Sequence, residues 1–429
     1  MKNEAGPAYA AAIEFLSSLR IFGAKFGLET TQRLAAAVGN PQAQLRFIHV
    51  AGTNGKGSVC AMLEGIYRAA GLRVGLFTSP HLVSFRERIQ VNRRLIPAAE
   101  VVRLVRELRA VQTQNDVTLF EFTTVLALKF FAEQQCDLVI WETGLGGRLD
   151  ATNIVTPLAS VITNIALDHQ QWLGDTLAKI AAEKAGIIKP GVPAITATDA
   201  PEALRVIETV AEKNGSSLTR VGEKSISNLS LPVPLWGDHQ KINAALALAT
   251  VAGLQKKIPV SAEQIHAGLA AVDWAGRLQR LRQPDGRQFL LDGAHNIAAM
   301  ETLRATLEKQ YPGAKQVFIF GALQDKNWPG LCRLLAPLAA KIFTVPVASE
   351  RTADPRELTA AFRAANPALP VVTCGNLAAA LIACEKEPFV IITGSLYLVG
   401  EALEQFGWSS AGGERGLNEW RAPALPPQG

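Results

Sequence analysis

Short apolar runs rich in β-branched residues alternate with helical patterns through most of this chain. Residues 45–52 (LRFIHVAG), 136–144 (CDLVIWETG), 159–166 (ASVITNIA) and 192–198 (VPAITAT) are runs of this kind. Runs that are apolar at nearly every position are typical of strands buried on both faces. Because parallel strands need a crossover, usually a helix, the alternation predicts an α/β fold with a mostly parallel sheet.

A second alternating series begins near residue 287, with predicted strands in QFLLDGAHN, KQVFIFGA, KIFTVPV, PVVTC and PFVIITG. A polar stretch punctuated by Gly and Pro, residues 273–287, separates the two series. At 429 residues the chain also exceeds what one hydrophobic core usually supports. We therefore predict a first domain over residues 1–276, a smaller Rossmann-like α/β domain over 277–410, and a loose or only locally packed tail over 411–429.

The composition is that of a compact soluble protein. Hydrophobic residues make up 48% and charged residues 19%, and the formal net charge of +5 favours anionic ligands such as nucleotides without pointing to nucleic acid. The five cysteines lack C-x-x-C spacing and are predicted to be reduced core thiols. The N-terminus lacks the apolar core of a signal peptide and no run approaches membrane-spanning length, so we expect a cytoplasmic protein.

The first predicted strand runs into GTNGKGS and then into a helix. Gly52, Gly55 and Gly57 allow backbone amides to converge on an anion, and the start of the helix adds its dipole. Lys56 would reach the terminal phosphates of a nucleotide triphosphate. The spacing departs from the common G-x-x-x-x-G-K-[ST] pattern, because Val50 replaces its first glycine and Gly57 separates lysine from serine. The alternative is a glycine-rich turn that binds nothing.

Polar clusters also follow other predicted strands, at residues 78–81, 141–153 and 163–169. Ligands gather at the carboxyl ends of parallel strands, so these clusters should face the same crevice as the phosphate loop. Ser79 and Glu142 offer the hard oxygen ligands that magnesium prefers, and His169 is a less usual ligand. Taken singly, Ser79 could be a turn residue and His169 a structural histidine.

At the level of motifs the chain resembles the folylpolyglutamate synthase and dihydrofolate synthase family, the folate branch of the Mur-ligase-like enzymes. The resemblance runs in one order from about residue 9 to about residue 407, through GTNGKGS, SPHL, GLGGRLDATN, ALDH, EKAGI, DGAHN and ITGSLYLVG. It implies a Mur-ligase-like first domain with a phosphate loop. It also implies a ligase that joins glutamate to dihydropteroate or to folates through an acyl phosphate.

The resemblance carries ligand roles onto particular residues. For ATP it implies Gly55, Lys56, Gly57, Ser58, Asn243, Arg277 and Asp292. For the pteroate or folate it implies Leu119, Phe120, Glu121, Phe122, Leu149, Asp150 and Ala151. His295 and Ser395 are candidates for glutamate, and Lys56, Asp292 and His295 for catalytic roles. The segment from Leu119 also has helical periodicity, so the start of a core helix is the alternative there.

The resemblance also implies two magnesium ions. Ser79 and Glu142 would bind the first and His169 the second. Lys184, in EKAGI, would be carbamylated by carbon dioxide, which turns an ammonium group into an anionic oxygen ligand for the second metal. Unmodified, Lys184 would be an ordinary surface helix residue.

Two other functions remain open at this point. A peptidoglycan-type amino-acid ligase would share the phosphate loop, the metal histidine and the modified lysine, but GLGGRLDATN and SPHL argue against it. A nucleotide-dependent binding module would leave the residues 292–296 and the second domain without a task. We expect a monomer whose partners are ATP, glutamate and a pteroate or folate, with no nucleic acid or membrane. Asn327, where an aspartate is expected after Lys326, puts only fine substrate contacts in doubt.

Overall fold

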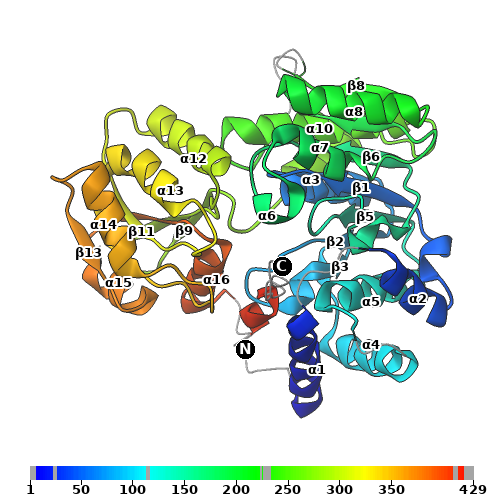
Figure 1. The fold of residues 1–429 in the computed structure, drawn as a ribbon, viewed down its shortest axis with the longest axis horizontal. Helices are drawn as coiled ribbons and strands as arrows, with labels where there is room; N and C mark the ends of the chain where they lie inside the picture. The colour runs from blue at the N-terminus through cyan, green and yellow to red at the C-terminus, as the bar shows by residue number, and fades with distance from the viewer. Residues whose placement is uncertain are drawn as a thin grey trace, which may run out of the picture.

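The computed structural model describes residues 6–22, 27–112, 116–222, 225, 233–408 and 414–419. It contains two separate β-sheets, each packed between helices, which confirms the predicted α/β class (Figure 1). The strands of the first sheet all precede residue 221, and those of the second begin at residue 279. The boundary that we place after residue 276 lies between these two sets of strands.

The first sheet has the strand order β4-β3-β2-β5-β1-β6-β7-β8. Six of these strands run parallel, while β3 pairs antiparallel with β2 and β4. The bounds are β1 Phe47–Ala51, β2 Val74–Phe77, β3 Ile89–Val91, β4 Arg94–Leu95, β5 Leu138–Glu142, β6 Ala159–Ile162, β7 Ala194–Thr196 and β8 Leu218–Arg220. The central β1 lies between β5 and β6, so polar residues after these three strands meet at one edge.

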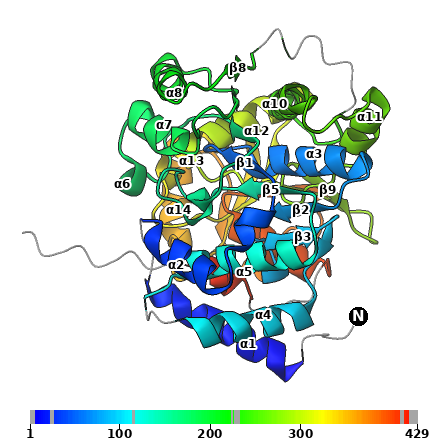
Figure 2. The same cartoon turned by 90° about the vertical axis from the view of Figure 1, so that its right-hand side faces the viewer.

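Alternate residues of the central strands pack into two different hydrophobic cores. On β5, Trp141 joins the core of α1, α2, α4 and α5, while Ile140 joins that of α3, α10 and α11. Figure 2 shows these helices on opposite sides of the sheet, and α6–α8 pack at its β6–β8 end. Their bounds are α1 Pro7–Ser18, α2 Glu29–Ala37, α3 Lys56–Ala69, α4 Ala98–Val111, α5 Leu119–Glu133, α6 Gln170–Leu173, α7 Leu177–Ala185, α8 Pro201–Lys213, α10 Asp238–Leu254 and α11 Ala262–Ala270. The short 3-10 helices are η1 Leu19–Phe22, η2 Pro41–Gln44, η3 Phe85–Arg88, η4 Ala151–Ile154, η5 Ala336–Leu338 and η6 Glu414–Asn418.

The second sheet has the order β13-β12-β11-β14-β10-β9, parallel except for β9. Its strands are β9 Gln279–Arg282, β10 Gln288–Leu291, β11 Gln316–Phe320, β12 Ala339–Thr344, β13 Val371–Thr373 and β14 Phe389–Thr393. Its helices are α12 Ile297–Gln310, α13 Trp328–Leu335, α14 Pro355–Ala365, α15 Leu377–Ala383 and α16 Leu396–Gln405. The edge strand β9 lies inside the polar stretch predicted to separate the two domains, and an edge strand tolerates such polar residues.

Within the tail predicted to be loose or only locally packed, the structure describes residues 414–419. Residues 414–419 include η6, which packs against α1 and η3. Glu414 is 6% exposed, and its carboxylate accepts hydrogen bonds from Tyr9 and Ser84. A carboxylate surrounded by donors fixes a segment that lacks apolar periodicity, and sequence patterns do not report such contacts.

The structure also bears on the predictions for the cysteines and for membrane-spanning segments. All five cysteines are buried and free, which confirms the predicted reduced core thiols. Within the described ranges, no helix combines the length and apolarity needed to cross a bilayer.

Candidate active site

The predicted strand, loop and helix are present around the phosphate loop. β1 ends at Ala51 and α3 begins at Lys56. Gly52 and Gly55 have φ angles of 145° and 86°, which side chains rarely adopt. A Cβ on Gly52 would lie 1.7 Å from Thr163 Oγ1, so the loop has no room for a side chain there. The amides at the start of α3 therefore follow directly on a tight loop, as an anion site requires.

Two lysines converge on one carbonyl of this loop. Gly52 O accepts hydrogen bonds from Lys56 Nζ at 3.1 Å and from Lys184 Nζ at 2.8 Å. Lys184 is 5% exposed, and burial, with the charge of Lys56 second, lowers the pKa of its ammonium group to about 7. Lys184 is therefore not an ordinary surface residue, and near neutral pH a large fraction of it is an uncharged amine.

Ser79 and Glu142 meet at the ends of the neighbouring strands β2 and β5. The amide of Ser79 donates to Glu142 Oε2 at 3.0 Å. Burial raises the pKa of the Glu142 carboxyl to about 6, and the charge of Lys56 opposes that rise. Lys56 therefore lies close enough to Glu142 for its charge to act on this carboxyl.

The donor set around Glu142 fits magnesium held together with phosphates. In the part of the chain that the structure describes, no group of three or more His, Cys, Asp or Glu side chains could hold a metal unaided. Magnesium, however, commonly binds one or two carboxylates and takes its remaining ligands from water and substrate phosphates. Ser79 and Glu142 supply oxygen atoms beside the phosphate loop and meet that requirement.

His169 directly precedes α6 and has a left-handed φ of 52°. Burial first, and the charge of Lys326 second, lower the pKa of its imidazole to about 3. A neutral imidazole can serve as a metal ligand. Lys184 as a free amine adds no oxygen, so a second magnesium here fits only if Lys184 carries a carbamate.

Asp168 joins the two domains. Its carboxylate accepts from Lys326 Nζ at 2.7 Å and from Asn296 Nδ2 at 3.0 Å, and His295 Nε2 lies 3.6 Å away. Burial opposes ionisation of this carboxyl, but its hydrogen bond with His295 and the charge of Lys326 outweigh burial and hold the pKa well below its usual range. Asn54, in the phosphate loop, also exchanges side-chain hydrogen bonds with Asn296, at 3.2 and 3.0 Å.

The sequence did not single out Asn54, Asp168, Asn296 or Lys326 for a role. Three of them lie inside the quoted motifs GTNGKGS, ALDH and DGAHN, and Lys326 precedes the noted Asn327. Their positions in these motifs were the available signal. Their pairing across the domains needed the structure.

We expect Asp168→Asn to lower the free energy of unfolding by about 3 kcal/mol. The substitution leaves the Lys326 ammonium group, whose side chain is 10% exposed, without its counter-charge. Urea unfolding at neutral pH measures the loss. Asp238→Asn is the matched control, because its bridge to Lys309 is about 60% exposed and should contribute less than about 1 kcal/mol. Equal losses in the two variants would contradict the prediction.

The predicted nucleotide residues lie around the phosphate loop and the domain junction. A Cβ on Gly55 would be 2.6 Å from Asn243 Oδ1, so this side chain borders the loop. Ser58, in the first turn of α3, accepts from Gln240 at 3.3 Å. Asp292 accepts from the Leu278 amide at 2.9 Å, and burial raises its pKa while the nearby Arg277 opposes that rise.

One cavity of about 480 Å³ brings several of these residues together. Gly57, Ser79 and Glu142 line it from the first domain, Arg277 from the junction, and Leu396 from the second domain. A cleft lined by both domains can change shape when they move.

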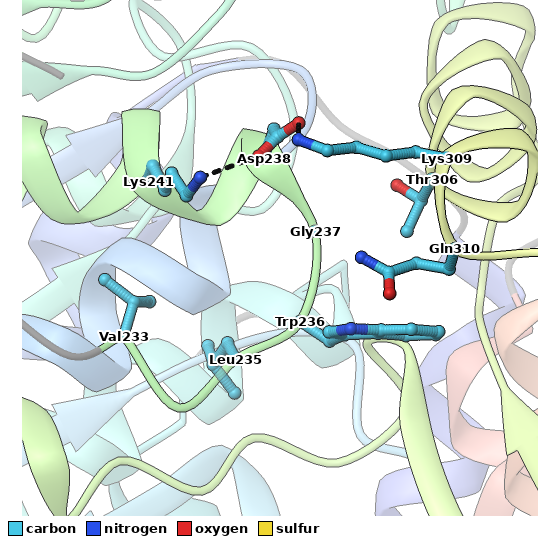
Figure 3. Close-up of a pocket in the computed structure, with 9 residues that line it drawn as sticks. All are labelled: Val233, Leu235, Trp236, Gly237, Asp238, Lys241, Thr306, Lys309 and Gln310. Atoms are coloured by element: carbon cyan, nitrogen blue, oxygen red, sulfur yellow. Dashed lines mark hydrogen bonds and ion pairs between the residues drawn. The ribbon is translucent and has the colours of Figure 1, made fainter. Parts of the chain in front are cut away.

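A smaller cavity of about 240 Å³ lies near the far end of α12 (Figure 3). Asp238 bridges Lys241 of its own helix at 2.9 Å and Lys309 of α12 at 2.7 Å. None of the predicted site residues lines this smaller cavity, so the larger cavity is the candidate active site.

The predicted pteroate residues divide into two groups. Phe120 and Leu149 are partly exposed, and the Phe120 ring fills the space that a Cβ on Gly144 would occupy. Leu119, Phe122 and Ala151 are buried in the core.

The two carboxylates of the pteroate set have structural partners. Glu121 Oε2 accepts from the Thr118 amide at 2.8 Å and completes a capping box at the start of α5. Asp150 caps η4 and accepts from the Leu145 amide at 2.7 Å. The structure therefore agrees with the alternative interpretation, in which the segment from Leu119 is the start of a core helix.

The two glutamate candidates differ in accessibility. His295 is partly exposed, with Nδ1 2.8 Å from Gly293 O and Nε2 facing Asp168. Ser395 is 2% exposed, and its hydroxyl caps α16 by accepting from the Tyr397 amide at 3.1 Å. The structure brings His295 to the interdomain cluster and gives Ser395 a role within its own helix.

Comparisons with known proteins agree with this geometry. Residues 50–251 match the Mur ligase middle domain, and residues 276–396 match the Mur ligase glutamate ligase domain. The chain is 34% identical to the dihydrofolate synthase/folylpolyglutamate synthase of Bacillus subtilis, over 92% of this chain and 98% of that protein. It is 32% identical to the Escherichia coli protein of the same name, over 96% and 98%.

Solved structures show the same similarity in three dimensions. Escherichia coli FolC in complex with DHPP and ADP has a TM-score of 0.85 at 32% identity, and the match covers 95% of this chain and 99% of that one. Mycobacterium tuberculosis folylpolyglutamate synthase complexed with ADP and AMPPCP has a TM-score of 0.84 at 30% identity, with coverage of 93% and 99%. The chain therefore belongs to the folylpolyglutamate synthase and dihydrofolate synthase family of Mur-ligase-like proteins.

Proposed function

We propose that this protein is an ATP-dependent ligase that adds L-glutamate to dihydropteroate, to folate glutamate tails, or to both. One observation carries the proposal: Lys56 and Lys184 both donate to the Gly52 carbonyl, and the charge of Lys56 acts on the buried carboxyl of Glu142. The names of the relatives support glutamate and folate as substrates. The same full-length matches argue against a peptidoglycan-type ligase or a module that only binds nucleotide.

The reaction proceeds in two steps. The substrate carboxylate attacks the γ-phosphorus of ATP, and the bond from this phosphorus to the β–γ bridging oxygen breaks. ADP departs, and the substrate becomes an acyl phosphate. Lys56 and the amides at the start of α3 stabilise the charge on the transferring phosphoryl group. The glutamate nitrogen then attacks the acyl carbon, phosphate departs and the amine loses a proton. The Asp168 contacts between the domains would keep water from the acyl phosphate.

We further propose two magnesium sites. Ser79 and Glu142 would hold one ion, and His169 with carbamylated Lys184 the other; bound magnesium would neutralise charge on the ATP phosphates. The lowered pKa of Lys184 supports the modification, because only the uncharged amine attacks carbon dioxide. That attack forms an N–C bond, releases a proton and leaves an anionic carbamate.

The remaining assignments are proposals of the same kind. Asn243, Arg277 and Asp292 border the nucleotide, and Phe120 and Leu149 are the accessible members of the pteroate set. His295 is the better placed glutamate candidate. We also propose a cytoplasmic monomer that does not bind nucleic acid, supported by five free thiols and a net charge of only +5.

Phosphate release by the purified protein tests the proposal. Release should require ATP, glutamate and either dihydropteroate or tetrahydrofolate together, and the preferred acceptor distinguishes the two activities. ATP turnover that ignores both glutamate and the acceptor would contradict a ligase.

A further inference from the structure

The described tail, residues 414–419, lies against the loop that carries Ser79; we call these residues the C-terminal strap. Glu414 Oε2 accepts hydrogen bonds from the Phe85 amide at 2.7 Å, from Ser84 Oγ at 2.9 Å and from the Tyr9 hydroxyl at 3.1 Å. Hydrogen bonds to a carboxylate are roughly twice as strong as neutral ones. One buried side chain of the strap therefore anchors the loop and the first helix together.

The strap also fixes His81, two residues after Ser79. His81 Nδ1 lies 2.8 Å from Arg88 Nε, and its Nε2 lies 3.0 Å from the Glu414 carbonyl oxygen. Because the Arg88 guanidinium can only donate and a carbonyl can only accept, the ring carries its proton on Nε2. Asn418 Nδ2 in turn donates to His81 O at 2.8 Å. Arg88 thus holds one ring nitrogen of this histidine, and the strap holds the other ring nitrogen and the backbone carbonyl.

The other side of the strap binds the second domain. Arg415 forms an ion pair with Glu404 of α16, and Glu419 forms one with Arg351 at 3.1 Å. The same loop touches this domain directly, because a Cβ on Gly400 of α16 would lie 2.0 Å from Leu82 O. The strap is therefore in contact with both domains at the point where they enclose Ser79.

We propose that Glu414 is a positioning residue for the Ser79 loop. It holds residues 81–85 so that the Ser79 amide stays hydrogen-bonded to Glu142, with the strap joined to the second domain by Arg415 and Glu419. The kinetic consequence rests on the proposed function, since Ser79 matters there as an oxygen donor for magnesium. The structural consequence does not.

The test compares full-length Glu414→Ala with Glu404→Ala. Glu404→Ala is the matched control, because it removes an anchor of the strap on the second domain but leaves the bonds to the loop. In Glu414→Ala, amide hydrogen exchange of residues 81–88 without ligands should quicken by about tenfold or more, which corresponds to the loss of one or two hydrogen bonds to a charged group. Exchange in β1 and α3 should stay unchanged.

Kinetics give a second measurement. Glu414→Ala should raise the half-saturating magnesium concentration for ligation by about tenfold, while kcat at saturating magnesium stays within about twofold. Glu414→Gln should fall between wild type and Glu414→Ala, because its amide oxygen still accepts the same donors. A merely structural role would instead lower the folded fraction without shifting the magnesium dependence.

The outcomes separate the two proposals. Wild-type exchange at residues 81–88 in Glu414→Ala, or equal effects of Glu404→Ala, would overturn the role of Glu414. If Glu414→Ala does not fold, unchanged exchange in Glu414→Gln overturns it and quickened exchange confined to the loop supports it. If Glu414→Ala shows faster loop exchange but the wild-type protein ligates no glutamate, the positioning role of Glu414 is supported and the proposed function is refuted.

Discussion

In Lys56→Ala we expect kcat for ATP-dependent glutamate ligation to fall by about a thousandfold. The Lys56 ammonium group now bonds the backbone carbonyls of Gly52 and Thr53, at 3.1 and 3.2 Å. It can exchange those carbonyls for phosphate oxygens without breaking an ion pair, so its charge is available to the transferring phosphoryl group. Phosphate release in the presence of ATP, acceptor and glutamate measures the loss.

The same substitution has an electrostatic consequence that checks the geometry. Lys56 opposes the raised pKa of Glu142 and contributes to the lowered pKa of Lys184. Without its charge, both pKa values should rise. Lys256→Ala, at an exposed position at the end of the first domain, is the control for handling and folding. Ligation by Lys56→Ala at the wild-type rate would remove the basis of the active-site assignment.

The long buried strands could be predicted because a strand that is buried on both faces is recognisable from its own apolar residues, whichever strands it pairs with. β1, β5 and β11 are buried at every position, and their mostly apolar sequences indicated this. β2 was indicated only by the polar cluster at residues 78–81 that follows it, because the strand itself has only four residues and includes Gly75. A Cβ on Gly75 would lie 2.9 Å from Phe131, so the packing that requires this glycine also weakens the strand pattern.

The β3–β4 hairpin could not be predicted from the sequence because its turn residues are unusual. Asn92 and Arg93 both have positive φ angles, 47° and 63°. Asparagine is common in such turns, but arginine is unusual in this conformation, so the pair lacks the Asn-Gly pattern that marks a two-residue hairpin. Tertiary context therefore overrides the local preference here.

The residues of the candidate site also divide into those that the sequence could bring together and those that it could not. Lys56, Ser79 and Glu142 follow strands, and the carboxyl-edge rule places residues after neighbouring parallel strands together. Asp168 and Lys326 are 158 positions apart, and Glu414 and Tyr9 are 405 apart. No local pattern encodes contacts of that kind.

For Glu121 the local signal was present and was outweighed by the resemblance. Thr118 and Glu121 have the spacing of a capping box, and the structure contains that box. A residue that a family resemblance assigns to a ligand can therefore also have a role in the fold.

Lys184→Met should lower ligation by at least about 100-fold and make the protein more stable at neutral pH. The stability effect follows from the buried ammonium group. Its pKa is about 7 in the folded protein against an ordinary value of 10.5, so between these pH values the unfolded chain binds more protons. The wild-type free energy of unfolding therefore rises with pH across that window, and the burial penalty is fully present below it.

Urea unfolding in buffer free of carbon dioxide measures this difference. Lys184→Met should exceed wild type by about 4 kcal/mol at pH 6.5, and the excess should shrink steadily toward pH 10. Lys179→Met is the matched control in the same helix, because Lys179 is largely exposed and should show neither effect. Added bicarbonate should raise wild-type ligation and leave Lys184→Met unchanged, since only wild type has an amine there to form the carbamate. A parallel pH dependence of stability in wild type and Lys184→Met would show that Lys184 stays charged when buried, and with it the physical reason for carbamylation would be lost.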